Sequence, residues 1–412
     1  MAQILSSIDI GSNSIVCLSS TVNSDGKLCL KSASIQESRG IKGGNIVDVK
    51  LATESILKAI VKSEKMLKKN IDTLIVGLSG ELIKSKVVTS GTSFNSKKIT
   101  KRDIFLLAKP IIDNLRDAKK VPIHIFPLLS QVNKDIVDNP VGMIANDIST
   151  DFYTMYVDNT KINNIKNCFK KIDLKIDNFV FDAYASAVGV LSEQEKMVGS
   201  LVINIGANTT SFVVIKDNKL VYGNSIQLAG EIITKDIADV LRVPYDVAEE
   251  IKIKNSNFYI DEIEGNELIK IDINNYENNF RVLSTTTIDT VNDIVKARIS
   301  DIMDIIFSIL HKKCPNNTFY NIVLTGGTAN ITGIADYVSR ITGGIKSRVG
   351  YVTDFYAVSV IDKKEISNPS YATAFGLLSF VHLFYKNNKI EEYNNSGFFN
   401  RIFSFLSNLF IS

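Results

Sequence analysis

The chain has 412 residues, of which 45% are hydrophobic, so it is long enough to bury a sizeable core in about two to four domains. Its 47 Lys and Arg side chains against 44 Asp and Glu leave a net charge of only +3, with both signs interspersed. Nucleic-acid binders carry a concentrated basic stripe, which this chain lacks. We therefore expect no nucleic acid among its partners.

The first residues, MAQILSSIDIGS, lack the basic segment and long apolar run of a secretory signal peptide. No stretch of about 18 apolar residues is present, which argues against a transmembrane helix but leaves room for a helix that lies on a membrane surface. We expect a protein that stays in the cytoplasm.

Strand-like runs alternate with helical patterns along the chain. TLIVGLSG (73–80), LVINIG (201–206) and NIVLTGG (321–327) are rich in β-branched residues, whereas 291–310 repeats its apolar residues at helical spacing. This alternation predicts α/β layers.

Three segments interrupt the alternation. Residues 86–165 predict an inserted module of short strands with a helix over Ile99–Leu115. The Asn-rich residues 254–280 are expected to form loops of another lobe. Residues 386–397, KNNKIEEYNNSG, contain few apolar groups and predict a flexible linker.

Two short stretches resemble each other at a separation of 195 positions. IDIGSNSIV (8–16) aligns with INIGANTTSF (203–212), each an apolar strand that runs into Gly and small polar residues and back into a strand. Gly11 and Gly206 would let the backbone turn tightly and bring N–H groups close to phosphate oxygens. Two ordinary tight hairpins are the alternative for either stretch alone.

A third element favours the phosphate interpretation. NIVLTGGTANITGI (321–334) predicts a buried strand, a diglycine turn and a helix start, the arrangement that lets a backbone approach a nucleotide beside a helix N-terminus. We interpret the three glycine turns together as a nucleotide site between two related half-domains.

With these motifs the sequence resembles the actin superfamily of ATPases, which carry phosphate-1, phosphate-2 and adenosine motifs in this order, and more closely the FtsA family of bacterial cell-division proteins. The closer resemblance spans the chain to about residue 385. It rests on RGIKGGNIVD (39–48), KKITKRDI (97–104), PIHIFPL (122–128), DNPVGM (138–143), SEQEK (192–196), AEEIK (248–252), KSRVG (346–350) and NPSYATAFGLLSF (368–380).

The resemblance implies an actin-like (ribonuclease-H-like) α/β fold of two halves with an inserted FtsA-type subdomain and a C-terminal amphipathic helix. The implied boundaries are 1–82 with 163–198 and 366–385 for the first half, 83–162 for the inserted subdomain, 199–226 and 310–365 for the second half, 227–309 for its upper lobe, 386–397 for the linker and 398–412 for the helix.

The resemblance also implies the function. Family members bind ATP with Mg²⁺, assemble into filaments, and hold the tubulin-like protein FtsZ, among other division proteins, at the cytoplasmic face of the cell membrane at the division site. Two alternatives stay open: a phosphotransferase or phosphatase of the same superfamily that acts on a small substrate, and an actin-like scaffold of pilus assembly.

The residues that match the family's nucleotide contacts are Asp9, Gly11, Ser12, Asn13, Gly206, Ala207, Asn208, Thr209, Gly230, Glu249, Lys252, Gly326, Gly327 and Asn330. Asp9 is the position expected near hydrated Mg²⁺, which prefers oxygen ligands and keeps its water. For Glu249 and Lys252, a solvated ion pair at i, i+3 on a helix is the alternative.

The phosphate-2 stretch lacks its usual carboxylates. The matching acids fall on Asn204 and Ser211, which are neutral, and an amide cannot take a proton. Loss of one general base typically costs about 10²- to 10⁴-fold in rate, so we expect weak or absent ATPase activity. Asp182 is the candidate for the missing group, and an exposed or helix-capping aspartate is its alternative.

The last residues, SGFFNRIFSFLSNLFIS, predict a membrane-docking helix with one broad apolar face. The face comprises Phe398, Phe399, Ile402, Phe403, Phe405, Leu406, Leu409 and Phe410. One such helix is a marginal anchor, so we expect stable attachment to need copies linked in a filament. For the FtsZ C-terminal peptide, the resemblance suggests the helix around Lys296 and Arg298, with ordinary surface lysine and arginine as the alternative.

Overall fold

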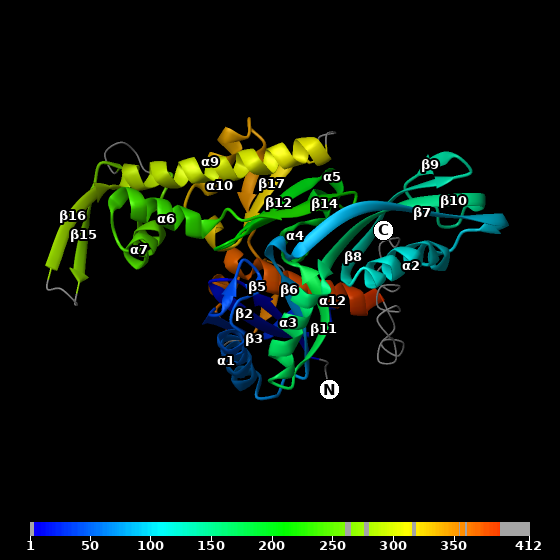
Figure 1. Ribbon diagram of the computed structural model, residues 1–412, viewed down its shortest axis with the longest axis horizontal. Coiled ribbons are helices and arrows are strands. Elements are labelled where there is room, and N and C mark those ends of the chain that lie inside the picture. Colours follow the sequence, from blue (N-terminus) through cyan, green and yellow to red (C-terminus); the bar gives the residue numbers. More distant parts are fainter. Residues whose placement is uncertain are drawn as a thin grey trace.

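The computed structural model describes residues 4–259, 265–275, 280–314, 319–353, 355–358 and 361–387. Figure 1 shows two β-sheets with helices between and around them, a third sheet that extends to one side, and a long helix across the top. The predicted C-terminal helix, 398–412, lies outside the described residues. None of the described helices combines the length and hydropathy needed to span a bilayer.

The first sheet contains six strands, three of which form an antiparallel meander near the N-terminus. In spatial order the strands are β11 (Lys175–Phe181), β6 (Thr73–Leu78), β1 (Leu5–Ile10), β2 (Ser14–Val22), β3 (Leu28–Glu37) and β19 (Tyr356–Ala357). Both β6 and β11 run parallel to β1. Helix α1 (Val49–Leu67) packs on β2 and β3 and beside α3 (Asn159–Lys170). Asp48 caps α1 by accepting hydrogen bonds from the N–H groups of Lys50 and Leu51.

The second sheet repeats the order of the first. Its strands are β14 (Lys219–Ile226), β13 (Thr210–Lys216), β12 (Ser200–Ile205), β17 (Asn321–Thr325) and β18 (Lys346–Val349). Here β12 pairs antiparallel with β13 and parallel with β17, as β1 does with β2 and β6. The two similar stretches of sequence thus occupy equivalent strands, which confirms the predicted relation between two halves.

Several described helices and a hairpin accompany the second sheet. They are α6 (Gly230–Leu241), α7 (Tyr245–Asn255), α9 (Ile288–Lys313), α10 (Ile334–Ile341), and the strands β15 (Leu268–Asn275) and β16 (Phe280–Thr287). α9 packs against α6, α7 and α10 and shares a hydrophobic core with the sheet. The expectation of loops throughout 254–280 was wrong, because β15 pairs with β16 despite its asparagines.

The third sheet has its own core. Its strands are β7 (Ile83–Lys98), β10 (Ile144–Asp158), β8 (Lys120–Val132) and β9 (Asp135–Val137), and α2 (Lys101–Asp117) packs on it. Thr100 and Asp103 start α2 with a reciprocal capping box. The expected short strands were wrong for the most part: three strands run for 13 to 16 residues, because the polar residues that suggested breaks lie on exposed faces.

Tyr153 joins this third sheet to the second. Its hydroxyl donates to the carbonyl of Gly223 (2.8 Å) and accepts from the N–H of Gly223 (2.9 Å). Burial raises the pKa of Tyr153 above its ordinary value, so the phenol stays protonated and keeps both bonds.

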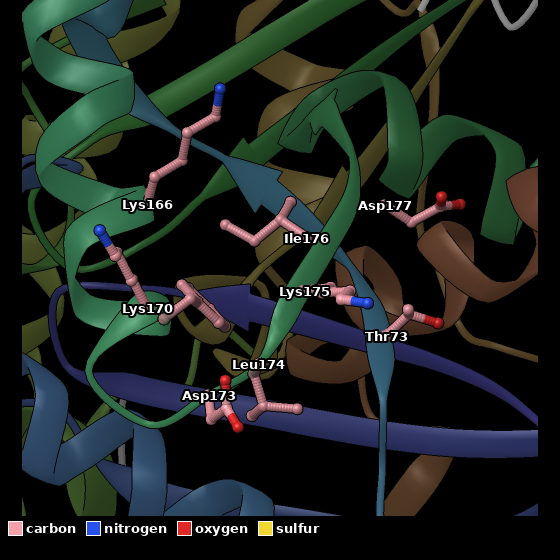
Figure 2. Close-up of a pocket in the computed structure, with 9 residues that line it drawn as sticks. Thr73, Lys166, Lys170, Asp173, Leu174, Lys175, Ile176 and Asp177 are labelled. Carbon is pink, nitrogen blue, oxygen red and sulfur yellow. The ribbon is translucent and has the colours of Figure 1, made fainter. Parts of the chain in front are cut away.

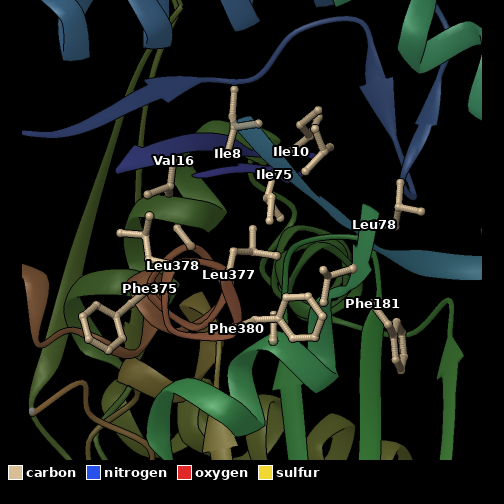
Figure 3. Packing of buried hydrophobic residues seen from close by; sticks show 14 of the residues in the cluster. Ile8, Ile10, Val16, Ile75, Leu78, Phe181, Phe375, Leu377, Leu378 and Phe380 are labelled. Carbon is tan, nitrogen blue, oxygen red and sulfur yellow. The ribbon is translucent and has the colours of Figure 1, made fainter. Parts of the chain in front are cut away.

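Two helices lie between the halves. In α4 (Asp182–Val190) and α12 (Ala372–Asn387) the backbones come close together at Gly376, where an added Cβ would lie 1.7 Å from the carbonyl oxygen of Ala185. α12 also packs on β1, β2 and β6. Figure 3 shows Leu377 and Leu378 of this helix directed toward apolar side chains of these strands. The core of the first half therefore continues into the contact between the halves.

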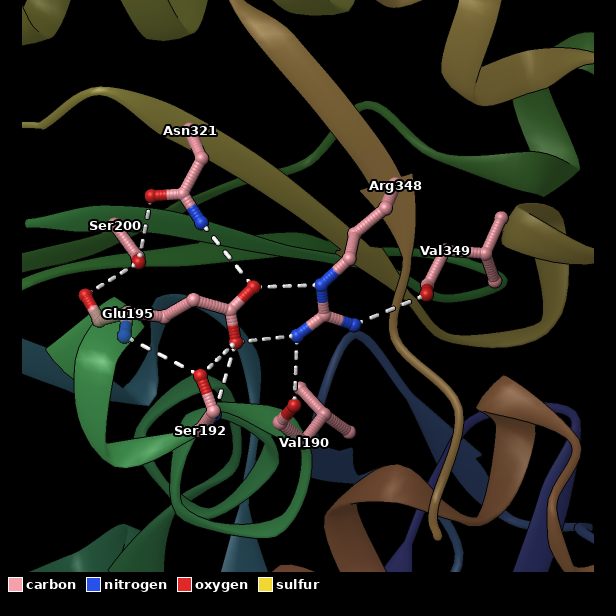
Figure 4. Close-up of polar contacts among 7 residues, drawn as sticks. All are labelled: Val190, Ser192, Glu195, Ser200, Asn321, Arg348 and Val349. Atoms are coloured by element: carbon pink, nitrogen blue, oxygen red, sulfur yellow. Dashed lines mark hydrogen bonds and ion pairs between the residues drawn. The ribbon is translucent and has the colours of Figure 1, made fainter.

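A polar network fixes the C-terminal end of α4 to the second sheet (Figure 4). Arg348 on β18 donates to both carboxylate oxygens of Glu195 (2.7 Å each) and to the carbonyl of Val190 (2.8 Å). Glu195, in α5 (Glu193–Val198), also accepts hydrogen bonds from the backbone N–H and hydroxyl of Ser192. The SEQEK and KSRVG stretches, distant in sequence, thus meet through one bidentate pair.

The remaining elements are short. They are β4 (Ile41–Lys42), β5 (Asn45–Ile46), η1 (Gly80–Leu82), η2 (Gly327–Asn330), α11 (Lys363–Ile366) and η3 (Pro369–Tyr371).

Candidate functional site

The two phosphate-type turns have the same local geometry. The N–H of Gly11 donates to the carbonyl of Ser14 (3.1 Å), and the N–H of Gly206 donates to that of Thr209 (3.0 Å). A Cβ added at Gly11 would lie 2.7 Å from the Ser14 oxygen, and one at Gly206 would lie 3.1 Å from the Thr209 oxygen. Both turns are therefore too tight to accept a side chain without adjustment.

The N–H groups inside these turns are available to a ligand. Within the described part of the chain, the backbone N–H groups of Ser12, Asn13, Ala207 and Asn208 have no hydrogen-bond acceptor. Ser12 accepts a hydrogen bond through its hydroxyl from the N–H of Gly43 (3.0 Å). Consecutive unpaired N–H groups in a tight turn suit an anion such as phosphate.

The diglycine turn at Gly326 and Gly327 packs against the second phosphate-type turn. Gly326 has φ = 86°, which favours glycine, and an added Cβ would lie 2.5 Å from both Asn204 Oδ1 and the Ile205 oxygen. The hydroxyl of Thr328 donates to the carbonyl of Gly206 (3.3 Å). η2 follows Gly326 directly, and the predicted helix, α10, begins only at Ile334.

Asn330 ties this turn to the start of α12. Its amide nitrogen donates to the Gly327 carbonyl (3.0 Å), Asn368 Oδ1 (3.1 Å) and Ser370 Oγ (3.2 Å). Both Gly327 and Asn330 are exposed. The carbonyl of Pro369, in the same segment, accepts a hydrogen bond from Gly326 (3.1 Å).

Gly230 begins α6 against the same turn. Its N–H donates to the Gly206 carbonyl (3.0 Å), and an added Cβ would lie 2.8 Å from Thr328 Oγ1. Lys252 Nζ donates to the Gly230 carbonyl (3.2 Å), Thr234 Oγ1 (2.8 Å) and the Glu249 carboxylate (2.6 Å). Glu249 and Lys252 thus form the i, i+3 pair of the alternative interpretation, but Lys252 is only 12% exposed and links α7 to α6 beside Gly206.

A cluster of polar side chains lies between the halves. Asp182 Oδ2 accepts from Ser211 Oγ (2.7 Å) and from Asn204 Nδ2 (3.3 Å), and Oδ1 accepts from the N–H of Ala183 (2.7 Å). Asn204 Nδ2 also donates to Thr373 Oγ1 (3.4 Å). Asp182 is 3% exposed, so it is neither an exposed nor a simple capping aspartate. The structure brings the candidate Asp182 to the neutral position 204.

Two carboxyl groups in this region have raised pKa values. Removal from water raises the pKa of Asp182 to about 7, helped by the negative charge of Asp9 and opposed by the hydrogen bond from Ser211. Removal from water also raises the pKa of Asp9 to about 7. In the described residues the Asp9 carboxylate has no hydrogen-bond donor, and it lies 3.1 Å from the place of a Cβ on Gly77. An unpartnered carboxylate at this position fits a cation.

A magnesium ion held mainly by phosphates and water needs only one or two protein carboxylates. The described residues contain no group of three or more His, Cys, Asp or Glu side chains that could hold a metal without a ligand. The carboxylate of Asp9 beside the turn around Gly11 fits the single carboxylate that such an ion needs.

Sequence reasoning missed several polar residues of this site. Thr234, Thr328, Thr373 and Ser370 were not named as site residues, although they bond the glycine turns and Asn204. Thr328 stands in the TGGT stretch, and Ser370 and Thr373 stand in NPSYAT. Both stretches had been noted for the family resemblance. Thr234 had no signal, because a Thr inside a helix has no characteristic spacing.

The two partner candidates lie on α9, away from the glycine turns. Arg298 donates to both carboxylate oxygens of Asp236 (2.8 and 3.0 Å) and to Asp301 (3.1 Å). These bonds raise the pKa of Arg298, chiefly through the hydrogen bond to Asp236. Lys296 Nζ lies 5.4 Å from the centre of the Phe258 ring. A bound acidic peptide would have to compete with Asp236 for Arg298.

The chain is similar to known proteins along most of its length. A family model described as "Cell division protein FtsA" matches residues 201–376. Several curated proteins named "Cell division protein FtsA" match the chain. That of Neisseria meningitidis serogroup B is 27% identical over 390 residues, covering 91% of this chain and 89% of its own. That of Pseudomonas aeruginosa is 26% identical over 385 residues, covering 90% and 88%. That of Buchnera aphidicola (subspecies Acyrthosiphon pisum) is 26% identical over 415 residues, covering 98% and 96%.

Solved structures share the fold at low sequence identity. The "PilM-PilN type IV pilus biogenesis complex" matches with a TM-score of 0.65 at 12% identity, covering 92% of this chain and 98% of its own. The "MreB5 of Spiroplasma citri bound to ADP" matches with a TM-score of 0.56 at 14% identity, covering 96% of this chain and 99% of its own. The "MamK double helical filament" matches with a TM-score of 0.52 at 13% identity, covering 92% of this chain and 98% of its own. These matches show the actin-like α/β fold and, at such identities, nothing finer.

Proposed function

Because the chain belongs to the FtsA family of cell division proteins, we propose that it binds ATP and Mg²⁺ between its two halves, assembles into filaments, and holds FtsZ at the cytoplasmic face of the cell membrane. The observation that carries the proposal is the contact between the turns at Gly206 and Gly326, together with the unpartnered carboxylate of Asp9. Gly43 links the turn at Gly11 to them, because its N–H donates to the hydroxyl of Ser12 and an added Cβ on it would lie 4.0 Å from Thr209.

Each part of the site supplies one kind of contact. The free N–H groups of Ser12, Asn13, Ala207 and Asn208 donate to phosphate oxygens, since their directions are fixed by the two tight turns. Asp9 accepts hydrogen bonds from the water ligands of Mg²⁺, which offsets phosphate charge when bound. The nucleoside side is lined by Gly327, Asn330, Glu249 and Lys252, and the exposed backbone at Gly327 lets a flat base approach closely.

Turnover depends on Asp182 rather than on Asn204. As a carboxylate, Asp182 can accept a proton, whereas the amide of Asn204 can only hold the Asp182 oxygen in place. Its pKa of about 7 leaves Asp182 partly protonated at neutral pH, which lowers its availability as a base. We therefore propose a slow ATPase or a nucleotide switch that binds without rapid hydrolysis.

The remaining parts serve assembly and attachment. We propose that the subdomains follow the boundaries given by the resemblance, with the third sheet as the inserted FtsA-type subdomain and α6, α7, α9 and the β15–β16 hairpin as the upper lobe. The segment 398–412 docks on membrane lipid as an amphipathic helix. Lys296 and Arg298 receive the acidic C-terminal peptide of FtsZ, with exchange of Arg298 from Asp236 to the peptide.

The test of the nucleotide proposal is to incubate the full chain with Mg²⁺ and labelled ATP, and to identify the nucleotide that stays bound. Retained ATP supports a binding switch, and retained ADP supports turnover through Asp182. The Asp9→Asn variant should lose the Mg²⁺-dependent part of binding, whereas Asp135→Asn, an exposed matched control on β9, should not. An empty site at millimolar ATP in the unsubstituted chain would refute the proposal.

A further inference from the structure

A pocket lies in the first half, at the opposite end of the sheet from the glycine turns. Its volume is about 440 Å³, within the range of about 300 to 1,000 Å³ that small-molecule sites occupy. It is lined by Thr73, Lys166, Phe169, Lys170, Asp173, Leu174, Lys175, Ile176 and Asp177. Thr73 and Lys175 are the first residues of β6 and β11, whereas Asp182 follows the last residue of β11. The pocket and the nucleotide site are thus separated by the length of a seven-residue strand, about 20 Å.

Lysines reach the pocket from two sides. Figure 2 shows Lys166 and Lys170 extending from α3 on one side, with Lys175 and Thr73 on the other. No ion pair within the described residues involves any of these three lysines. Two carboxylates also line the pocket, and that of Asp177 points away from the lysines in Figure 2.

The surroundings add to this positive charge. Lys68 and Lys171 are exposed in the loops at the same end of the sheet, where the N–H of Lys175 donates to the carbonyl of Asp72 (3.3 Å). A chain with a net charge of only +3 therefore concentrates lysines around one hollow. Such a concentration attracts anions, and lysine ammonium groups commonly bind phosphate as point charges.

The walls restrict the kind of anion. Phe169 is 1% exposed and forms a rigid apolar floor, and Leu174 and Ile176 are half-buried beside it. Such walls suit a ligand with a short carbon skeleton next to its charge, because the skeleton covers apolar surface that water would otherwise cover. We propose that this pocket binds a phosphate group attached to a small glycerol-like skeleton, whether free in solution or as the headgroup of an anionic lipid.

The experiment compares two triple variants of the full chain. The pocket variant is Lys166→Gln, Lys170→Gln and Lys175→Gln. The control variant is Lys58→Gln, Lys62→Gln and Lys65→Gln, which removes the same charge from exposed positions of α1 outside the pocket. One arm measures binding of soluble glycerol 3-phosphate by calorimetry. The other measures co-sedimentation with phosphatidylcholine vesicles with and without about one third phosphatidylglycerol.

We expect the pocket variant to lose binding in at least one arm by about tenfold or more relative to the control variant. A loss confined to the soluble arm assigns the site to a free phosphoester, and one confined to anionic vesicles assigns it to a lipid headgroup. Equal losses in both variants, or no loss in either, would overturn the proposal. Binding of labelled ATP should be equal in the two triple variants, so a loss confined to the pocket variant does not depend on the nucleotide site.

Discussion

Asn204 donates a hydrogen bond from its side-chain amide to the carboxylate of Asp182, with 3.3 Å between nitrogen and oxygen. The two residues belong to different halves, on β12 and at the start of α4. A carboxylate at position 204 would instead repel Asp182 in a region already shielded from water. The missing acid of the phosphate-2 stretch is therefore matched by an acid at 182, and the neutral amide lets that acid stay buried.

The substitution Asn204→Asp places a second carboxyl group beside Asp182. Because two negative charges at this distance disfavour each other, the pKa values of both groups should rise. We expect the free energy of unfolding to fall by about 1 to 3 kcal/mol at pH 8 and by less at pH 5. Urea unfolding at the two pH values measures this, and Asn70→Asp, at an exposed position, is the matched control. An equal loss at both pH values would contradict the repulsion.

Asp182→Asn removes the proton acceptor but keeps the shape of the side chain. Whatever ATP turnover the chain has should fall by about 10²- to 10⁴-fold, with little change in nucleotide affinity. Single-turnover assays with labelled ATP and separate binding titrations distinguish the two. Ser211→Ala removes one donor to Asp182 and should have a smaller effect. An unchanged rate would mean that Asp182 takes no part.

The raised pKa values make stability depend on pH. In the folded chain Asp9 and Asp182 have pKa values of about 7, against 3.8 for an ordinary aspartate, so between about pH 4 and 7 the folded state holds more protons than the unfolded state. The free energy of unfolding should therefore decrease as pH rises through this window, by up to about 1.4 kcal/mol per pH unit for each group.

Urea unfolding of the nucleotide-free chain across pH 4 to 8 measures that slope. Asp9→Asn should remove the contribution of one group, whereas Asp135→Asn should remove none. Addition of Mg²⁺ and ATP should flatten the slope, because a bound cation favours the charged carboxylates. A slope that is the same in all variants would show that other groups dominate.

Arg348→Lys keeps the charge but loses the fork that holds Glu195 and the Val190 carbonyl. We expect a loss of about 1 to 3 kcal/mol in the free energy of unfolding, since several charge-assisted hydrogen bonds go at once. The measurement is chemical unfolding at neutral pH. Arg340→Lys, at an exposed site on α10, should change stability by less than about 0.5 kcal/mol. Similar values for the two variants would argue against a stabilising role for the network.

Gly376→Ala tests the contact between α4 and α12, the two helices that lie between the halves. Since the new Cβ would lie 1.7 Å from the Ala185 oxygen, α4 and α12 must move apart. Overpacking of this kind typically costs about 1 to 3 kcal/mol, occasionally more. Thermal unfolding measures the loss, and Ser379→Ala, half-buried on the same helix, is the control. A wild-type melting temperature for Gly376→Ala would show that the helices can separate at no cost.

The sequence predicted those parts of the fold that follow from local patterns. Gly11 and Gly206 stand in near-identical contexts, so the relation between the two halves could be seen before the strands were paired. The strand lengths of the third sheet could not be predicted from the sequence, because polar residues on an exposed face resemble turn residues. Asp182 was found only as a candidate, because its contact with Asn204 depends on how α4 lies against β12.

The hydrogen-bond partners of Arg298 and Arg348 could not be predicted from the sequence either. Asp236 and Glu195 are 62 and 153 positions away from them, and no periodic pattern connects such pairs. Residues that bond across the chain without a repeated motif become visible only when the elements are placed in space.

The hydrogen bonds from Gly326 to Pro369 and from Asn330 to Asn368 have a mechanical consequence. They join the diglycine turn to the segment from which α12 starts, and α12 runs the full width of the first half before the chain continues toward its C-terminal residues. A force applied at the C-terminal end of α12 is transmitted along the helix to the turn, because no flexible loop lies between them. A force on the C-terminal segment would therefore act on the diglycine turn that faces the nucleoside. Binding of a nucleotide at that turn would in return make the connection to α12 more rigid.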